Sequence, residues 1–334
     1  MKHQFPQLSV AFQTDKALGE YAELGLLAET YGFDTVSVYG DLMFQPPLAA
    51  LLTIANATRR IRLGPACLNP FTIHPVEIAG QVATLDAASR GRTYLGLSRG
   101  AWLDSIGIRP PRPLTAMREA VALIRHLLRG DESALAGTFY TLSEHHRLHF
   151  PVGRRDVPIL IGTWGAKLAS LAGELASEVK VGGSANPALV PLMLERIAAG
   201  ARRAGREPAE VGLVFGAVTV VDEDGKSARE RARAEVARYL PIVGPLDPTA
   251  KLEPDLLARI ENAVNGGDLG AAGSLIPDSV LDRFAFAGTP RQLARQAQAL
   301  LAAGATRIEF GTPHGLTARE GLRLLGEQVL PRLR

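Results

Sequence analysis

The sequence contains a single cysteine among its 334 residues, and several other features are missing as well. Cys67 has no partner for an internal disulfide, and a cysteine zinc cluster is excluded too. No dense basic run with interleaved aromatic residues occurs, which argues against nucleic-acid binding. No run approaches the roughly 20 apolar residues of a membrane span, and the start MKHQFPQLSV is not a signal peptide. We therefore expect a cytoplasmic protein without nucleic-acid or membrane partners.

The charges nearly balance, and no group of potential metal ligands stands out. Lys and Arg together number 37 against 34 Asp and Glu, which gives a net charge of +3. No set of His, Asp and Glu residues has the spacing of a metal site, so we predict no metal. With 46% hydrophobic and 21% charged residues, the composition is that of a globular protein. The length suits either two modest domains or one large α/β barrel with insertions.

Strand and helix signals alternate along the first 130 residues. Apolar or β-branched strands are predicted at residues 8–12, 34–39, from 61, and 93–98, and helices at 14–31, 47–58, 75–88 and 114–128. The last of these helices has one apolar stripe, which predicts a buried face. No two adjacent strands are close enough for a hairpin, so the pattern predicts a parallel sheet.

The alternation lapses into an irregular surface stretch over residues 130–155 and then resumes. Further strands are predicted at residues 158–162, 178–181, 211–221 and 307–310, with helices at 166–176, 187–204, 290–304 and from 317. A long helical insertion, about 227–284, follows the seventh strand. Eight such units predict a single (β/α)8 TIM barrel over residues 1–334, and the absence of GxGxxG after the first strand argues against a Rossmann fold. A barrel of this kind has its site at the carboxyl ends of the strands.

The third strand breaks early. Residues 61–75, IRLGPACLNPFTIHP, begin as a strand and then meet a Gly-Pro pair and two further prolines. Proline has no donor for a sheet ladder, so the strand must end near Cys67. Such breaks recur where the backbone approaches a ligand, whereas the alternative is an ordinary proline-rich loop.

The loop after the fifth strand, residues 162–167, reads Gly-Thr-Trp-Gly-Ala-Lys. Its two glycines allow the backbone to close on a ligand, and the helix that follows begins with unpaired N–H groups. Lys167 adds a positive charge, so the loop predicts an anion site for a phosphate. A plain turn before a helix is the alternative interpretation.

Other polar residues follow the remaining strands. Asp41 follows the second strand and either caps a helix or handles a proton. His74 and His314 follow the third and eighth strands, and either histidine is a candidate proton carrier or a structural residue. Asn69, Arg99, Trp102 and Gly183 also follow strands. Their common placement at one end of the barrel argues for a site more strongly than any single residue does.

With these residues in view, the chain resembles the bacterial-luciferase-like superfamily, and within it the deazaflavin-dependent branch typified by methylenetetrahydromethanopterin reductase. The resemblance covers nearly the whole length and is carried by GFDTVSVYGD (32–41), LGPACLNPFTIHP (63–75), SRGRTYLGLSRGAW (89–102), GTWGAKLASLAGELASEVKVGG (162–183), FAGTPRQL (286–293) and RIEFGTPHG (307–315). It implies a TIM barrel with an insertion after the seventh strand.

The resemblance also implies roles for individual residues. A non-prolyl cis peptide bond that supports the cofactor ring is implied at Ala66-Cys67, and the loop after the fifth strand is implied to hold the cofactor's phosphate. The predicted cofactor-binding residues are Ala66, Cys67, Asn69, Arg99, Gly162, Thr163, Trp164, Gly165, Ala166, Lys167 and Gly183, and the predicted catalytic residues are Asp41, His74 and His314. The chain keeps the acid of the Asp-His pair common in this branch but not the histidine. Ala101 stands where a relative that acts on glucose 6-phosphate has a glutamate, which argues against sugar-phosphate chemistry.

The implied activity is hydride transfer between the deazaflavin coenzyme F420 and a small organic substrate with an activated C=N or C=C bond. The resemblance makes a homodimer plausible. A monooxygenase of the same superfamily that uses reduced FMN and oxygen is the first alternative. A non-catalytic barrel that binds a flavin-like pigment or small ligand is the second.

Overall fold

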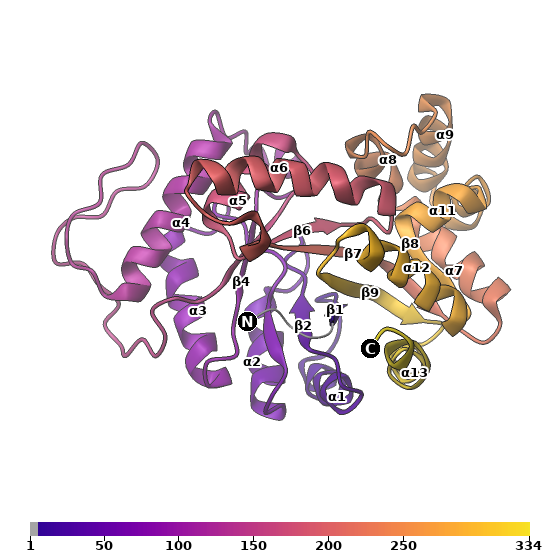
Figure 1. Cartoon of the computed structure of the whole chain (residues 1–334), viewed down its shortest axis with the longest axis horizontal. Helices are drawn as coiled ribbons and strands as arrows, with labels where there is room; N and C mark the ends of the chain where they lie inside the picture. The colour runs from indigo at the N-terminus through magenta and orange to yellow at the C-terminus, as the bar shows by residue number, and fades with distance from the viewer. Residues whose placement is uncertain (1–5) are drawn as a thin grey trace.

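The computed structural model describes residues 6–334, in which strands and helices alternate around a barrel (Figure 1). The strands are β1 (Gln7–Phe12), β2 (Thr35–Val38), β3 (Arg62–Pro65), β4 (Leu95–Ser98), β5 (Ile159–Gly162), β6 (Glu178–Gly182), β7 (Gly212–Val221), β8 (Ala285–Gly288) and β9 (Arg307–Gly315). Parallel pairing gives the order β3-β2-β1-β9-β7-β6-β5-β4. Isolated parallel bridges, Leu63 with Thr93 and Leu68 with Leu97, join β3 to β4. The predicted TIM barrel is confirmed.

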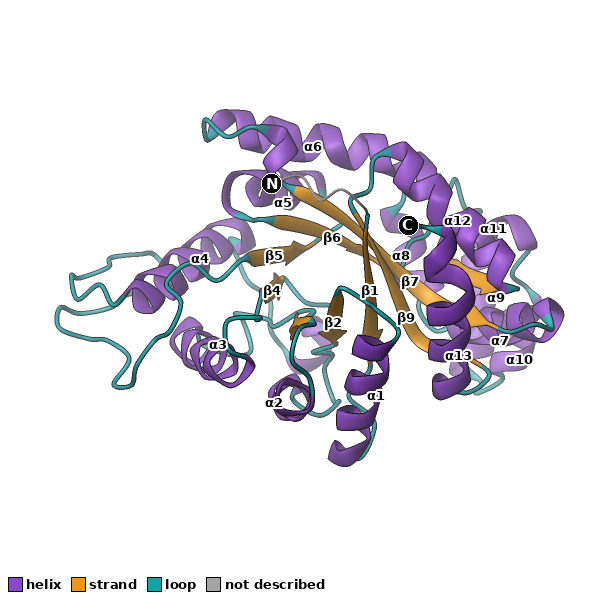
Figure 2. Cartoon of the chain, turned by 60° about the horizontal axis from the view of Figure 1, so that its bottom comes forward, coloured by secondary structure: helices purple, strands orange, loops and turns teal. Residues whose placement is uncertain are grey.

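Helices cover the outside of the sheet, as Figure 2 shows. Those packed around the barrel are α1 (Leu18–Thr30), α2 (Pro47–Ala57), α3 (Pro75–Ser89), α4 (Pro113–Arg129), α5 (Ala166–Leu175), α6 (Val190–Arg203), α12 (Pro290–Ala303) and α13 (Ala318–Leu324). Between β7 and β8 lie α7 (Gly225–Ala237), α8 (Leu240–Val243), α9 (Pro254–Asn265), α10 (Leu269–Ser274) and α11 (Asp278–Phe284). Across residues 6–334 no helix is both long and apolar enough to cross a membrane.

Helix ends follow local chemistry in some places and tertiary contacts in others. Thr289 and Gln292 form a capping box at the start of α12, and Gly304 ends that helix in the left-handed conformation with φ 115°, as its sequence predicts. The predicted cap at Thr14 is wrong, because α1 begins at Leu18. The Thr14 hydroxyl instead lies within hydrogen-bonding distance of the Gln13 side chain and the Tyr39 carbonyl.

The last part of the barrel differs from the prediction. The segment Ala285–Gly288 forms β8, which was not predicted, and it pairs with the second half of the ten-residue strand β7. β9 runs to Gly315 rather than ending at Phe310, and its pairing with β7 shifts register between Val218 and Thr219. Both differences arise because β7 is long enough to extend beyond the barrel and offer its edge to further strands.

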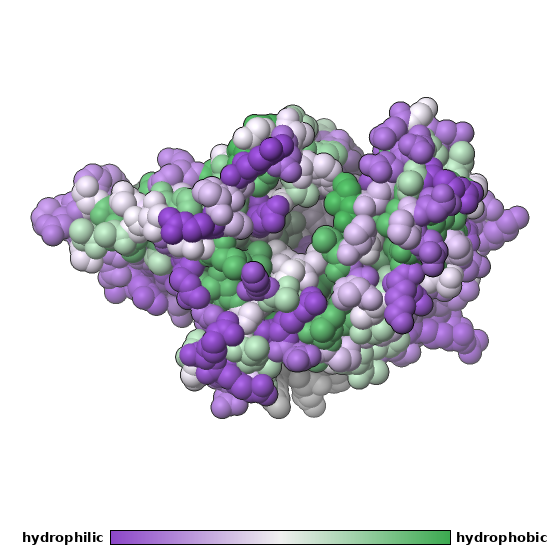
Figure 3. Space-filling model, turned by 90° about the horizontal axis from the view of Figure 1, so that it is seen from above, coloured by the Kyte–Doolittle hydropathy of each residue, from purple (hydrophilic) through white to green (hydrophobic). Residues whose placement is uncertain are grey.

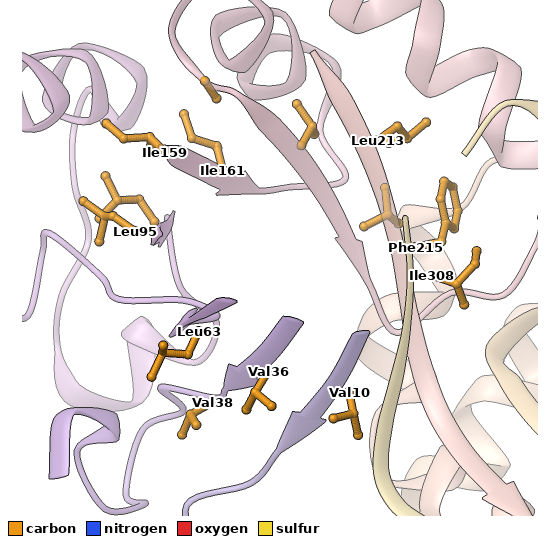
Figure 4. Close-up of a cluster of buried hydrophobic side chains, with 14 of the residues drawn as sticks. Val10, Val36, Val38, Leu63, Leu95, Ile159, Ile161, Leu213, Phe215 and Ile308 are labelled. Carbon is orange, nitrogen blue, oxygen red and sulfur yellow. The ribbon is translucent and has the colours of Figure 1, made fainter. Parts of the chain in front are cut away.

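Apolar side chains on the outer side of the strands form the main core against the helices. Figure 4 shows ten of them around the barrel: Val10, Val36, Val38, Leu63, Leu95, Ile159, Ile161, Leu213, Phe215 and Ile308, all of which are buried. Successive strand residues point to opposite faces, so every second residue joins this layer. A second apolar cluster lies within the insertion helices and packs against Trp164 of the barrel.

Two irregular regions complete the shape. Residues 130–158 project from the barrel as the long loop at the left of Figure 1, where one antiparallel bridge joins Leu135 and Leu142. The face of the molecule seen in Figure 3 is hollowed near its middle, with hydrophobic residues gathered on both sides of the hollow.

Candidate active site

A cavity of about 1340 Å³ opens at the carboxyl ends of the barrel strands. Its walls come from the segments that follow β1 to β7, from Thr312 of β9, and from the insertion through α7, α8 and the short helix η4 (Gly244–Leu246). Pockets for single drug-sized ligands are commonly about 300–1,000 Å³, so this one has room for a cofactor together with a second molecule. This is the end of a TIM barrel at which active sites occur.

The structure places every residue that was predicted to bind the cofactor in the wall of this one cavity. They are Ala66, Cys67, Asn69, Arg99, Gly162, Thr163, Trp164, Gly165, Ala166, Lys167 and Gly183. They come from the segments after β3, β4, β5 and β6, and Asp41, from the segment after β2, joins them. The parallel sheet accounts for this convergence, because parallel neighbouring strands all end at the same side of the barrel.

The segment after β3 and the end of β5 meet at one side of the cavity. The Ala66-Cys67 peptide bond is cis, as the family resemblance implies. A Cβ atom added at Gly162 would lie 3.0 Å from the Cys67 sulfur, so glycine is needed for this close approach. Burial raises the pKa of the Cys67 thiol to about 11. The thiol is therefore protonated at neutral pH and packs as a small apolar group rather than acting as a nucleophile.

The loop before α5 is held in a defined shape by its own polar groups. The Trp164 indole donates to the Gly182 carbonyl at 2.9 Å, and the Trp164 carbonyl accepts from Arg196 at 2.9 Å. The Gly165 N–H donates to the Thr163 hydroxyl at 3.0 Å. No side chain caps the first turn of α5, and that turn lies in the cavity wall with Lys167. A helix start with free N–H groups and an adjacent cation can bind an anion.

Asp41 faces the cavity and is held by Gln13, which sequence reasoning missed. The Gln13 side-chain amide donates to one Asp41 carboxylate oxygen at 2.8 Å. The orientation of that amide is fixed, because its oxygen accepts the backbone N–H of Thr14 at 2.8 Å. Asp41 is not a helix cap, since α2 begins after Pro46. Its carboxylate is therefore available to a ligand in the cavity.

The two predicted catalytic histidines lie outside the cavity wall. His74 caps α3, where its ring nitrogen accepts the Val76 N–H at 3.2 Å. His314 is fully buried, packs edge-to-face on Phe12, and lies 3.0 Å from the Ala11 carbonyl through its Nε2 atom. Burial lowers the pKa of His314 to about 4. The expectation that His314 follows the eighth strand fails because β9 extends past it.

The cavity floor contains a buried ion pair that was also missed. Lys180 of β6 lines the cavity and is 5% exposed, and its ammonium pairs with the fully buried Glu309 of β9. The same ammonium lies 5.0 Å from the centre of the Tyr39 ring. Burial opposes ionisation of Glu309, yet Lys180 and Arg307 together hold its pKa below the ordinary value. The pair is therefore charged at neutral pH.

Further polar groups continue from this pair through the barrel interior. Ser37 donates to Glu309 at 2.5 Å, and the Tyr94 hydroxyl lies 2.7 Å from the Ser37 hydroxyl. The Arg307 guanidinium lies 5.5 Å from the Tyr94 ring centre and 3.1 Å from the Glu178 carboxylate. A charged residue at alternate positions of an otherwise apolar strand, as in EVKVG and RIEF, was the signal in the sequence for this network.

The rim of the cavity is largely apolar. Met43, Phe44, Trp102, Ile242 and Leu246 all line it, and each is at least 40% exposed. The last two belong to the insertion, which therefore forms part of the site. Among residues 6–334 no cluster of three or more His, Cys, Asp or Glu could hold a metal ion.

The fold and the cavity together define a TIM-barrel protein built to hold a large anionic ligand over a charged floor. Residues 4–307 match the model of the luciferase-like monooxygenase family, and the chain belongs to that family. It is 32% identical over 315 residues to a 5,10-methylenetetrahydromethanopterin reductase of Methanolobus tindarius, covering 92% of this chain and 95% of the relative. It is 28% identical to an F420-dependent glucose-6-phosphate dehydrogenase of Rhodococcus erythropolis, covering 94% of each.

A solved structure gives the same picture. The coenzyme F420-dependent tetrahydromethanopterin reductase of Methanopyrus kandleri superposes with a TM-score of 0.91 at 26% identity, covering 99% of this chain and 100% of that one. The predicted relationship to the luciferase-like family is confirmed.

Proposed function

We propose that this protein is an F420-dependent oxidoreductase that transfers hydride between the deazaflavin and a small organic substrate with an activated C=N or C=C bond. The observation that carries the proposal is the convergence of all eleven predicted cofactor residues on one cavity large enough for a cofactor and a substrate. Membership of the luciferase-like family and similarity to F420-dependent relatives support it.

The residues of the cavity fit a deazaflavin that carries a phosphate. The uncapped first turn of α5 and Lys167 suit the phosphate, because together they present N–H donors and a positive charge. Gly162 and Cys67 give a flat, uncharged surface against which a ring can lie. F420 supplies hydride chemistry when bound, while the protein supplies position and electrostatics.

Asp41 is the residue that we assign to proton handling at the substrate. Its carboxylate lines the cavity, and Gln13 fixes one of its oxygens at 2.8 Å. The other oxygen is then oriented for a substrate N–H or O–H, and positioned acid–base groups of this kind contribute about 10²–10⁴ in rate. The apolar rim excludes water from the reacting atoms and accepts the body of the substrate.

The variant Asp41→Asn tests this role while keeping the size of the side chain. We expect the turnover number to fall by about 100-fold or more, with the Kd for F420 nearly unchanged. Turnover is measured from the absorbance of oxidised F420 with a panel of activated C=N and C=C compounds. Unchanged turnover would remove Asp41 from the mechanism, whereas a loss of F420 binding would assign it to the cofactor instead.

The cofactor assignment is tested by titrating the protein with F420 and with FMN, each oxidised and reduced, while following ring fluorescence. Micromolar binding of F420 with weak FMN binding is expected. Preference for FMN, followed by oxygen consumption with a reductase, would establish the luciferase-like monooxygenase instead. Tight F420 binding without turnover of any hydride acceptor would indicate a non-catalytic binding barrel.

We further infer a cytoplasmic homodimer in which residues 1–334 form one domain with an insertion at about 227–284. Packing of the insertion cluster on Trp164 supports a single domain. Leu18 and Leu26 are about half exposed on α1 and support a surface that a second copy covers. Light scattering of the wild type and of Leu26→Lys tests the dimer, because a buried lysine at that surface should shift the mass to that of one chain.

A further inference from the structure

The cavity floor carries a positive charge for which the proposed function, as stated so far, has no use. Lys180 reaches the cavity from β6 and is nearly enclosed, with its ammonium between the Glu309 carboxylate and the Tyr39 ring. A buried ion pair is weak support for stability, since an apolar pair of similar volume is often as stable. Branched apolar side chains usually fill the interior of a TIM barrel. The pair is therefore better explained by what lies above it.

The charge is fixed in place rather than mobile. Glu309 is fully buried and is also bonded by Ser37, so it cannot turn away from the ammonium. Tyr39 lines the cavity beside it, and burial, followed by the nearby carboxylates of Glu309 and Asp41, raises the pKa of its phenol well above the ordinary value. Tyr39 is therefore neutral and cannot cancel the charge of Lys180. A preorganised charge in a poorly solvated site acts on a ligand without reorganisation.

The interior as a whole is also positive. Beneath the cavity lie three cations, Lys180, Arg307 and Arg62, and two carboxylates, Glu178 and Glu309. Glu178 pairs with both arginines, and Glu309 pairs with Lys180. The floor therefore favours a ligand with negative charge above Lys180.

We propose that the Lys180 ammonium, held at the cavity floor by Glu309, stabilises negative charge on the reduced ring of the cofactor and so makes the protein bind reduced cofactor more tightly than oxidised cofactor. The inference rests on the proposed function. Addition of hydride, two electrons and one proton, to a neutral ring leaves that ring with one negative charge unless a second proton is added. A cation on the floor interacts with this added charge and has no counterpart on the oxidised ring.

The test compares the dissociation constants of oxidised and reduced F420, measured by fluorescence quenching and by calorimetry. The ratio of the two constants is the readout, and it does not depend on turnover. For Lys180→Met we expect the ratio to move about tenfold toward the oxidised form, which corresponds to a fall of about 30 mV in the midpoint potential of the bound two-electron couple. Lys180→Arg keeps the charge and should restore most of the preference.

Lys167→Met is the matched control, because it removes a lysine from the same cavity at the proposed phosphate site. Its loss should weaken binding of both forms equally and leave their ratio unchanged. A ratio that shifts equally in both variants would show a general effect of cavity charge and overturn the role of Lys180, as would an unchanged ratio in Lys180→Met.

Lys180→Met leaves Glu309 unpaired and can fail to fold. The double variant Lys180→Met/Glu309→Gln removes both charges and keeps a hydrogen-bond acceptor for Ser37. Because Lys180 lines the cavity and Glu309 does not, we expect a shift of the same sign but smaller size. A ratio equal to that of the wild type in this variant would also overturn the inference. Failure of the wild type to bind F420 in either state would instead overturn the proposed function.

Discussion

The two sides of the barrel wall differ in chemistry although the same strands build both. In β6, Val179 and Val181 belong to the apolar layer against the helices, whereas Glu178 and Lys180 pair with charged partners of β9 inside the barrel. β9 repeats the pattern, with Ile308 and Phe310 in the apolar layer and the charged residues between them. The alternation of strand side chains makes this division possible.

The difference shows where the chain invests in stability and where in chemistry. The outer layer needs only apolar residues of suitable volume, because it fills the space between strands and helices. The interior instead buries ions, whose desolvation is costly and must be balanced by pairing. The balanced charges lie directly beneath the cavity, so the interior has been shaped by the ligand as well as by folding.

The comparison is broken most severely by removing one ion from the interior. Glu309→Leu leaves Lys180 and Arg307 without this carboxylate in a fully buried position. We expect a loss of about 3–5 kcal/mol in the free energy of unfolding, because an uncompensated buried charge remains. Urea denaturation followed by circular dichroism measures it.

The double variant Lys180→Met/Glu309→Leu is the control for that prediction. With both partners apolar, no unpaired ion of this pair remains, and at least half of the lost stability should return. A double variant as unstable as the single one would mean that packing volume, and not charge, accounts for the loss.

Much of the barrel follows from the sequence because its signals are local. Strand and helix alternation, the Thr289 capping box and Gly304 each depend on a few neighbouring residues, and the structure has them where the sequence predicts them. The gathering of the predicted cofactor residues in one cavity follows from parallel topology alone. Loop 162–167 was therefore placed correctly in the cavity wall without knowledge of its contacts.

What could not be predicted depends on partners distant in the sequence. Lys180 and Glu309 are separated by 129 positions, and their pairing requires the register of β6, β7 and β9. Strand β8 is a short segment, AFAG, that becomes a strand only because β7 extends beyond the barrel. The same extension of β7 pairs with the end of β9 and buries His314. Local patterns cannot report such edges.

His314 sharpens the comparison because it places a titratable ring against the outer apolar layer. Burial lowers its pKa to about 4, from an ordinary value near 6.5. The unfolded chain takes up a proton below pH 6.5 that the folded chain refuses until about pH 4, so stability falls as the pH decreases between these values. The expected loss is about 3 kcal/mol.

Unfolding midpoints in urea at several pH values from 7 to 4 measure this loss. His314→Gln keeps a donor for the Ala11 carbonyl but does not titrate, so its stability should change less over the same range. An equal slope in both proteins would assign the pH dependence to carboxylates elsewhere and contradict the prediction.

The smallest effect belongs to the outer layer itself. Ile161 of β5 is fully buried in the apolar core, next to Gly162 in sequence but on the other face of the strand. Ile161→Val removes one methylene group and should cost about 0.5–1.5 kcal/mol of unfolding free energy. Because the side chain points away from the cavity, the F420 dissociation constants should not change. A variant that keeps its stability but loses cofactor binding would show that the two sides of the wall are not separable. The graded substitution Ile161→Ala, expected to cost about 2–5 kcal/mol, confirms that the measurement reports packing.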